Sequence, residues 1–149
     1  MISLHLKSEI LHRLDRDDEA LANELGVAEA LKDNPDLGPS HPVTLTSRHL
    51  IAQILLGLGR DEEALSRACA VAEARKKNPA LGPLHPDTLA SLHLVATILN
   101  RLGRGLEALP IELTVTDALD VNPAFGPSHL HTLASRKLIA RILERIGGA

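Results

Sequence analysis

A segment rich in proline and glycine occurs three times in the chain, and each copy starts 44 residues after the one before. The copies occupy residues 34–45, 78–89 and 122–133 and share the pattern Asn-Pro-x-(Leu/Phe)-Gly-Pro-x-His-x-x-Thr-Leu. A repeat of this length is typical of stacked arrays, in which one unit cannot bury its apolar face alone. The period therefore predicts a solenoid of similar units.

Each copy of this segment is expected to end one helix and begin the next. The residue before a proline is driven out of the right-handed helical region, so Asn-Pro ends the preceding helix. The glycine supplies the backbone freedom that a sharp reversal needs. Serine is a favoured N-cap, so we expect Ser40 and Ser128 to cap the helices that follow. The histidines at positions 41, 85 and 129 recur once per repeat, which indicates a structural role in capping or turn packing.

The segments between the copies overlay when the sequence is shifted by 44 residues, and their apolar residues recur at helical spacing. They predict an all-α fold of about seven helices, at residues 2–14, 17–33, 41–58, 61–77, 85–102, 105–121 and 129–146. We expect one domain, 1–149, with repeats at about 1–44, 45–88 and 89–132 and a final capping helix at 133–149. The turn that precedes every other first helix is missing at the start. The chain is therefore either a fragment of a longer array or begins without a cap.

The composition argues against several classes of function. One Phe and no Trp or Tyr among 149 residues leave a core of Leu, Ile, Val and Ala. The net charge of −3 and the lack of stacking aromatics argue against nucleic-acid binding. There is no apolar run of 18 residues and no signal-peptide pattern, so we expect a soluble, cytoplasmic protein without a membrane segment. The single cysteine, Cys69, has no disulfide partner and is expected to pack in the core.

Two further motifs carry a family resemblance. Leu-Gly-Arg-x-x-Glu-Ala-Leu occurs at 58–65 and 102–109, and Leu-Gly-Pro-x-His-Pro-x-Thr-Leu at 37–45 and 81–89. Together they resemble the tetratricopeptide repeat of the kinesin light chain kind, over essentially the whole chain. The resemblance implies a right-handed superhelix of helix hairpins, with the first helix of each hairpin lining a concave groove. It also implies binding of a peptide or protein partner in that groove.

The same frame assigns polar positions on the first helices to the groove. The candidate binding residues are His5, Glu9, His49, Gln53, Leu56, His93, Thr97, Asn100, Arg101, Lys137, Arg141 and Arg145. The three basic residues of the last helix stand one turn apart and are the best candidate for binding an anion. The column of groove histidines is too widely spaced for one metal ion and would suit a pH-sensitive groove. The alternative is that these positions are solvated helix surface.

The chain carries no recognisable motif for catalysis. It has no nucleophile elbow, no glycine-rich phosphate loop and no His-Glu-x-x-His pattern. His129 and His131 lack a neighbouring cysteine or carboxylate that would complete a metal site. We therefore expect a protein with no enzymatic activity, no cofactor and no metal.

Two hypotheses about function remain open. The first is a non-catalytic scaffold that binds a protein or peptide through the groove. The second is an oligomerisation or assembly segment that acts through the open ends of the solenoid and its amphipathic last helix. A partner would then share the apolar residues Leu138, Ile139, Ile142, Leu143 and Ile146.

Overall fold

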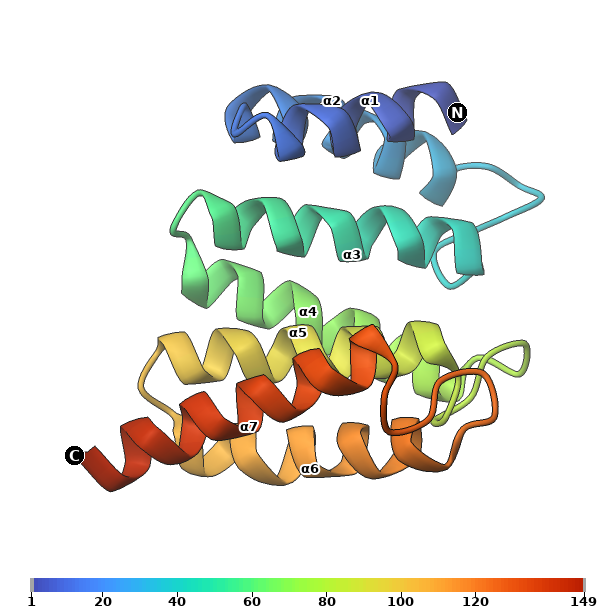
Figure 1. Ribbon diagram of the computed structural model, residues 1–149. Helices are drawn as coiled ribbons and strands as arrows, with labels where there is room; N and C mark the ends of the chain where they lie inside the picture. The colour runs from blue at the N-terminus through green and yellow to red at the C-terminus, as the bar shows by residue number, and fades with distance from the viewer. Residues whose placement is uncertain (1, 149) are drawn as a thin grey trace.

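The computed structural model describes residues 2–148, and these form seven α-helices without a strand (Figure 1). The helices are α1 (Ile2–Arg13), α2 (Asp17–Lys32), α3 (Pro42–Gly57), α4 (Asp61–Lys77), α5 (Pro86–Arg101), α6 (Gly105–Val121) and α7 (Leu130–Gly148). Their number and order confirm the all-α prediction. Their bounds differ from the predicted ones by at most two residues.

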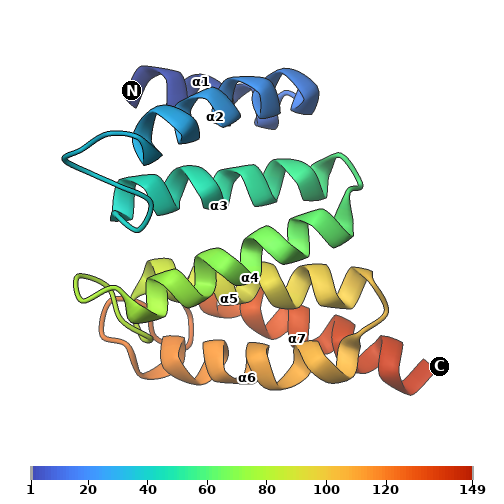
Figure 2. The same ribbon diagram turned by 180° about the vertical axis from the view of Figure 1, so that it is seen from behind.

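Consecutive helices pack as antiparallel hairpins, and the hairpins stack from α1 and α2 at one end to α6 and α7 at the other (Figures 1 and 2). Contacts also join α1 to α3, α3 to α5 and α5 to α7. Within the described chain, α2 makes no such contact with α4, nor α4 with α6. The stack therefore curves toward the first helices, and α1, α3, α5 and α7 line its concave side.

The repeated turns are built by their asparagines and glycines. The side-chain Oδ1 of each turn asparagine, in Asn34, Asn78 and Asn122, accepts a hydrogen bond of 2.8 Å from the backbone N–H two residues later. This Asx-turn continues the chain after the helix has ended. The following glycine has a φ of 82° at Gly38 and 90° at Gly82, a region that other residues adopt only with strain.

Histidine, and not serine, caps the helices that follow these turns. Nδ1 of His41 accepts a hydrogen bond of 3.1 Å from the N–H of Val43, and His85 and His129 make the same contact two residues downstream. The prediction that Ser40 and Ser128 cap these helices is therefore wrong. In α3 and α5 the proline at the first helical position sets the start, which leaves serine one residue too early. The structural role predicted for the turn histidines is confirmed.

The core is built from small and branched aliphatic side chains. Ile51 and Leu55 of α3 are buried in one cluster with Ala64 of α4 and with their counterparts in α5, whereas Ile54 is buried in a second cluster with the first hairpin. Burying a side chain of this size stabilises the fold by about 2 kcal/mol. The alanines between the helices let the backbones approach closely, which suits a chain with one Phe.

Two sequence expectations about burial are wrong. Cys69 lies exposed on the outer face of α4 and not in the core, in register with the exposed Leu25 and Leu113. Leu138 and Ile142 of α7 are buried within the chain's own core, so a partner cannot share them.

No helix among residues 2–148 combines the length and the hydropathy needed to cross a membrane.

Candidate functional site

The predicted groove residues all lie on the four first helices, which form the concave side. α1 carries His5 and Glu9, and α7 carries Lys137, Arg141 and Arg145. The two central helices carry the rest: His49, Gln53 and Leu56 in α3, and His93, Thr97, Asn100 and Arg101 in α5. The structure thus places every candidate on the expected helix.

A cavity of about 350 Å³ opens among α3, α5, α6 and the start of α7. It brings together three of the candidates, and the other nine are not part of its lining. Its polar lining contains His49 and Gln53 from α3, Asp87 and His93 from α5, and His131 from α7. Its apolar lining contains Leu89, Leu94, Val115, Leu119 and Phe125. The cavity can therefore hold an apolar side chain beneath a rim of hydrogen-bonding groups.

Several other candidates are engaged inside the chain. The guanidinium of Arg145 donates to the backbone carbonyl of Asn100, which ties α7 to α5. Arg101 forms an ion pair of 3.3 Å with Asp61 at the start of α4. The hydroxyl of Thr97 donates to the backbone carbonyl one turn earlier, at 2.9 Å. These residues stabilise the inner face and are less available to a ligand.

Lys137 and Arg141 differ from the other basic candidates. Both are exposed on α7, and neither forms an ion pair with any residue in 2–148. They are one turn apart on the same helix, so their charges repel each other by a few tenths of a kcal/mol. An acidic group bound between them would remove that repulsion.

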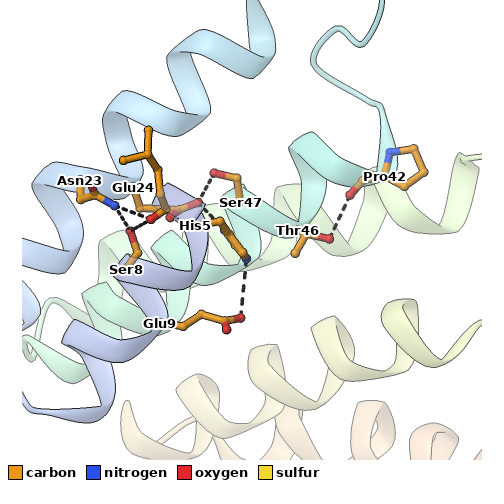
Figure 3. Close-up of polar contacts among 9 residues, drawn as sticks. His5, Ser8, Glu9, Asn23, Glu24, Pro42, Thr46 and Ser47 are labelled. Carbon is orange, nitrogen blue, oxygen red and sulfur yellow. Dashed lines mark hydrogen bonds and ion pairs between the residues drawn. The ribbon is translucent and has the colours of Figure 1, made fainter. Parts of the chain in front are cut away.

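A fully buried glutamate lies behind the groove in the first repeat. Glu24 of α2 accepts a hydrogen bond from Nδ1 of His5 at 2.8 Å and from the hydroxyl of Ser47 at 2.5 Å (Figure 3). His5 also lies 3.6 Å from Glu9, one turn along α1. The carboxylate thus joins its own repeat to the next one and orients the groove histidine.

The third repeat has the same arrangement. Glu112 of α6 is fully buried, and it accepts a hydrogen bond from His93 at 2.8 Å and another from Ser135 of α7. The hydroxyl of Ser135 also lies 2.6 Å from that of Thr116. A carboxylate can only accept hydrogen bonds, so Nδ1 of His93 carries the hydrogen.

The middle repeat replaces this buried acid with a buried base. Ala68 stands where the other repeats have glutamate, and Arg75 stands where they have leucine. Arg75 is 4% exposed, and its Nη1 donates at 2.8 Å to the backbone carbonyl of Asp87 and to the hydroxyl of Ser91. Its Nε has no partner in the described chain. The hydrogen bonds that hold the cation are therefore to neutral oxygens.

The change in the middle repeat also alters its groove histidine. Nδ1 of His49 lies 3.2 Å from the hydroxyl of Ser91, with no carboxylate in the place that Glu24 or Glu112 occupies. Burial and then the nearby charge of Arg75 lower the pKa of His49 to about 4. His49 is therefore neutral at physiological pH, and the groove histidines are not equivalent.

The buried charges were absent from the candidates, although the sequence carries a signal for them. Each lies in a helix among apolar residues at helical spacing, as Glu24 does between Ala20 and Val27. A charged residue within such a stripe is buried when a partner on the next helix satisfies it. The recurring serines of the first helices, Ser47 and Ser91, are those partners.

His129 and His131, which lack further metal ligands nearby in the sequence, have a structural role. Nδ1 of His129 caps α7, and its ring stacks on that of His131 at 5.1 Å between centroids. Phe125 packs edge-on against both rings. Within residues 2–148 no cluster of three or more histidines, cysteines or acidic residues has a geometry that could hold a metal ion.

No protein-family model and no curated protein sequence matches the chain. Solved structures do. The nearly identical TPR-like repeats of a Podosopora anserina protein described as a kinesin light chain align over 97% of this chain, with a TM-score of 0.86 and 25% sequence identity. A crystal structure of a single-substitution variant aligns over the same share with a TM-score of 0.85 and 25% identity.

In both comparisons the chain spans 66% of the length of the matched chain. The similarity covers all three hairpins and the last helix, and it agrees with the 44-residue period of the sequence. The chain is a repeat protein of the tetratricopeptide type, an all-α solenoid of helix hairpins.

Proposed function

We propose that the chain is a non-catalytic scaffold that binds a protein or peptide segment along its concave face. The observation that carries this proposal is the cavity of about 350 Å³ among α3, α5, α6 and the start of α7. Its apolar floor, which includes Leu94 and Val115, suits one apolar side chain of a bound segment. Its rim of His49, Gln53 and His93 suits the polar backbone on either side.

The charges of the groove indicate which way such a segment lies. At the α7 end, Lys137 and Arg141 are exposed and have no ion-pair partner in residues 2–148. At the α1 end, the side chain of Glu9 is 41% exposed and supplies an acidic group. A segment with an acidic residue toward α7 and a basic residue toward α1 would complement both ends.

Selection from a random peptide library on the immobilised chain provides a defined ligand for testing the groove. Calorimetry would then compare the wild type with a Lys137→Glu, Arg141→Glu variant. We expect at least tenfold weaker binding, which corresponds to about 1.4 kcal/mol. Both side chains are exposed, so the helical content should not change.

The matched control is Lys76→Glu with Lys77→Glu on α4, which changes the net charge equally on a second helix. It should bind as the wild type does. If the two variants lose affinity equally, the peptide responds to overall charge and the groove proposal fails. If neither variant loses affinity, the peptide does not use the basic end of the groove at α7.

Assembly through the ends of the solenoid is a second candidate, and one observation favours it. Leu6 and Ile10 of α1 are 52% and 48% exposed, whereas the equivalent Leu50 and Ile54 of α3 are 5% and 0% exposed. In α3 these residues are covered by the preceding second helix, whereas among residues 2–148 only α2 and α3 contact α1. Another apolar helix could cover them.

Light scattering after size exclusion tests this second candidate. An oligomer that Ile10→Glu or Leu143→Glu abolishes would favour assembly through an end, since both side chains are about half exposed. A monomer over a wide concentration range would exclude self-assembly. Ile142→Glu is unsuitable because Ile142 is fully buried and the variant would unfold.

A further inference from the structure

The groove histidines in the middle and third repeats have different buried partners. Behind His93 lies the carboxylate of Glu112 at 2.8 Å, and behind His49 lies the hydroxyl of Ser91 at 3.2 Å. Ser91 in turn accepts a hydrogen bond of 2.8 Å from Arg75. The buried partner decides which ring nitrogen carries the hydrogen, and hence what the other nitrogen offers to a ligand.

The hydrogen of the Ser91 hydroxyl fixes the tautomer of His49. Ser91 is fully buried, and its Oγ contacts two side chains in the described chain, those of Arg75 and His49. A guanidinium has no acceptor, so the hydroxyl must donate to Nδ1 of His49 or leave its hydrogen unpaired. An unpaired buried donor costs about 1–3 kcal/mol. Nδ1 therefore accepts, and Nε2 carries the hydrogen.

The opposite holds for His93. Its Nδ1 donates to Glu112, so in the neutral ring Nε2 has a free lone pair. Neither Nε2 has a hydrogen-bond partner in the part of the chain that the structure describes, and both rings line the same cavity. One histidine thus offers a donor to this cavity and the next offers an acceptor.

We infer that Arg75 and Ser91 make His49 a fixed N–H donor in the groove, and that a bound segment places an acceptor oxygen there and an N–H group at His93. The oxygen is either a backbone carbonyl or a carboxylate, since both accept from an imidazole N–H. This deepens the proposed function and depends on it for the ligand. The assignment of the two tautomers does not depend on it.

The charges around the cavity agree with an acceptor at this position. Arg75 lies behind Ser91 without a carboxylate in ion-pair contact among residues 2–148. Its charge polarises the hydroxyl and, through it, the imidazole, which strengthens the N–H as a donor. Asp87 is the one acid in the lining, and its exposed carboxylate is at the rim.

Nitrogen-15 NMR of the histidine rings tests the tautomers without any ligand. At pH 8 the protonated and the lone-pair nitrogens have widely separated shifts. His49 should carry its hydrogen on Nε2 and His93 on Nδ1. His41 and His85 are internal references, because their Nδ1 accepts from a backbone N–H and Nε2 must carry the hydrogen.

Two variants separate the imposed tautomer from the ordinary preference of a free ring. Ala68→Glu with Arg75→Leu gives the middle repeat the residues of the other two, and His49 should then move its hydrogen to Nδ1. Ser91→Ala removes only the partner, and both His49 nitrogens should shift toward an averaged, mixed tautomer. If His49 and His93 have the same tautomer in the wild type, or if neither variant changes His49, the inference is wrong.

Small probes test the ligand chemistry. Acetate supplies a carboxylate and N-methylacetamide a carbonyl, and each is titrated while the Nε2 resonance of His49 is observed. A shift with acetate alone indicates a carboxylate, and a shift with the amide indicates a backbone carbonyl. The shift should disappear in the Ala68→Glu, Arg75→Leu variant. If neither probe shifts the resonance, the acceptor site is refuted while the groove proposal can still hold.

Discussion

Removing the buried carboxylate of the third repeat should destabilise the fold by a calculable amount. Glu112→Ala deletes the acceptor of His93 at 2.8 Å and of Ser135. It thereby deletes one polar contact of α6 with α5 and one with α7. The perturbation is local, because alanine is a good helix former and the position is inside α6.

The magnitude follows from the two bonds that are lost. A hydrogen bond to a charged group contributes about 1.5–3 kcal/mol. Ser135 keeps its contact with Thr116 at 2.6 Å, and the partly exposed His93 can bond to water, so part of the loss is recovered. The second oxygen of Glu112 has no partner in the described chain, and its removal offsets a further part. The net loss should be about 2 kcal/mol, or a Tm lower by roughly 4–8 °C.

Thermal unfolding followed by circular dichroism measures this shift. Asp117→Ala is the control, since Asp117 is exposed on the same helix, and its Tm should remain within about 1 °C of the wild type. Glu112→Gln should lose less than Glu112→Ala, because the amide oxygen can still accept one hydrogen bond. An unchanged or higher Tm for Glu112→Ala would refute the reasoning, because the buried charge would then cost more than its bonds contribute.

Three further predictions concern the turns and the groove histidine. Asp15 has a φ of 58°, and the later repeats have glycine at this position. Asp15→Gly should therefore raise the free energy of unfolding by about 0.5–1 kcal/mol. Urea titrations measure this change, and a decrease would contradict the prediction. His85→Ala should lower the free energy of unfolding by about 1 kcal/mol because the N-cap is lost, whereas Ser40→Ala should change it very little. A larger loss for Ser40→Ala than for His85→Ala in the same titrations would overturn the cap assignment. The pKa of His49 is about 4 in the folded chain and near 6.5 when unfolded, so the unfolded state binds more protons between these values. The titration of His49 should therefore lower the free energy of unfolding by at most about 3 kcal/mol between pH 7 and pH 4. His49→Gln should reduce this pH dependence when the variant and the wild type are unfolded in parallel at each pH.

The fold was predictable because the repeat period and the turns act locally. Asn78 before a proline and a glycine at 82 end one helix and reverse the chain whatever packs around them. Apolar residues at helical spacing then fix which face of each helix is buried. The helices were predicted to within two residues because these signals agree with one another.

The caps were harder to predict because serine is a general N-cap signal. In this chain Pro42 sets the first helical position, so the residue before it, His41, occupies the cap and Ser40 does not. Histidine can serve there because its Nδ1 accepts the same backbone N–H that a serine hydroxyl would. The assignment depends on the register of one residue, which sequence patterns rarely resolve.

The groove was only partly predictable. Its residues were placed on the correct helices, but the roles of Arg101 and Arg145 depend on partners that lie far away in the sequence. The same is true of Arg75, whose carbonyl and hydroxyl acceptors belong to the next helix. Such pairs form only once the hairpins stack, so a local pattern can indicate that Arg75 is buried but not which groups it contacts.

Hydrogen–deuterium exchange with and without a selected peptide tests the central claim most directly. If the concave face is the binding site, protection should appear on α3, α5 and the start of α7, around the cavity that His49 and His93 line. The outer helices α2 and α4, which do not line the cavity, should exchange as before. Protection confined to α1 or to the outer helices would contradict the account and move the binding site away from the groove.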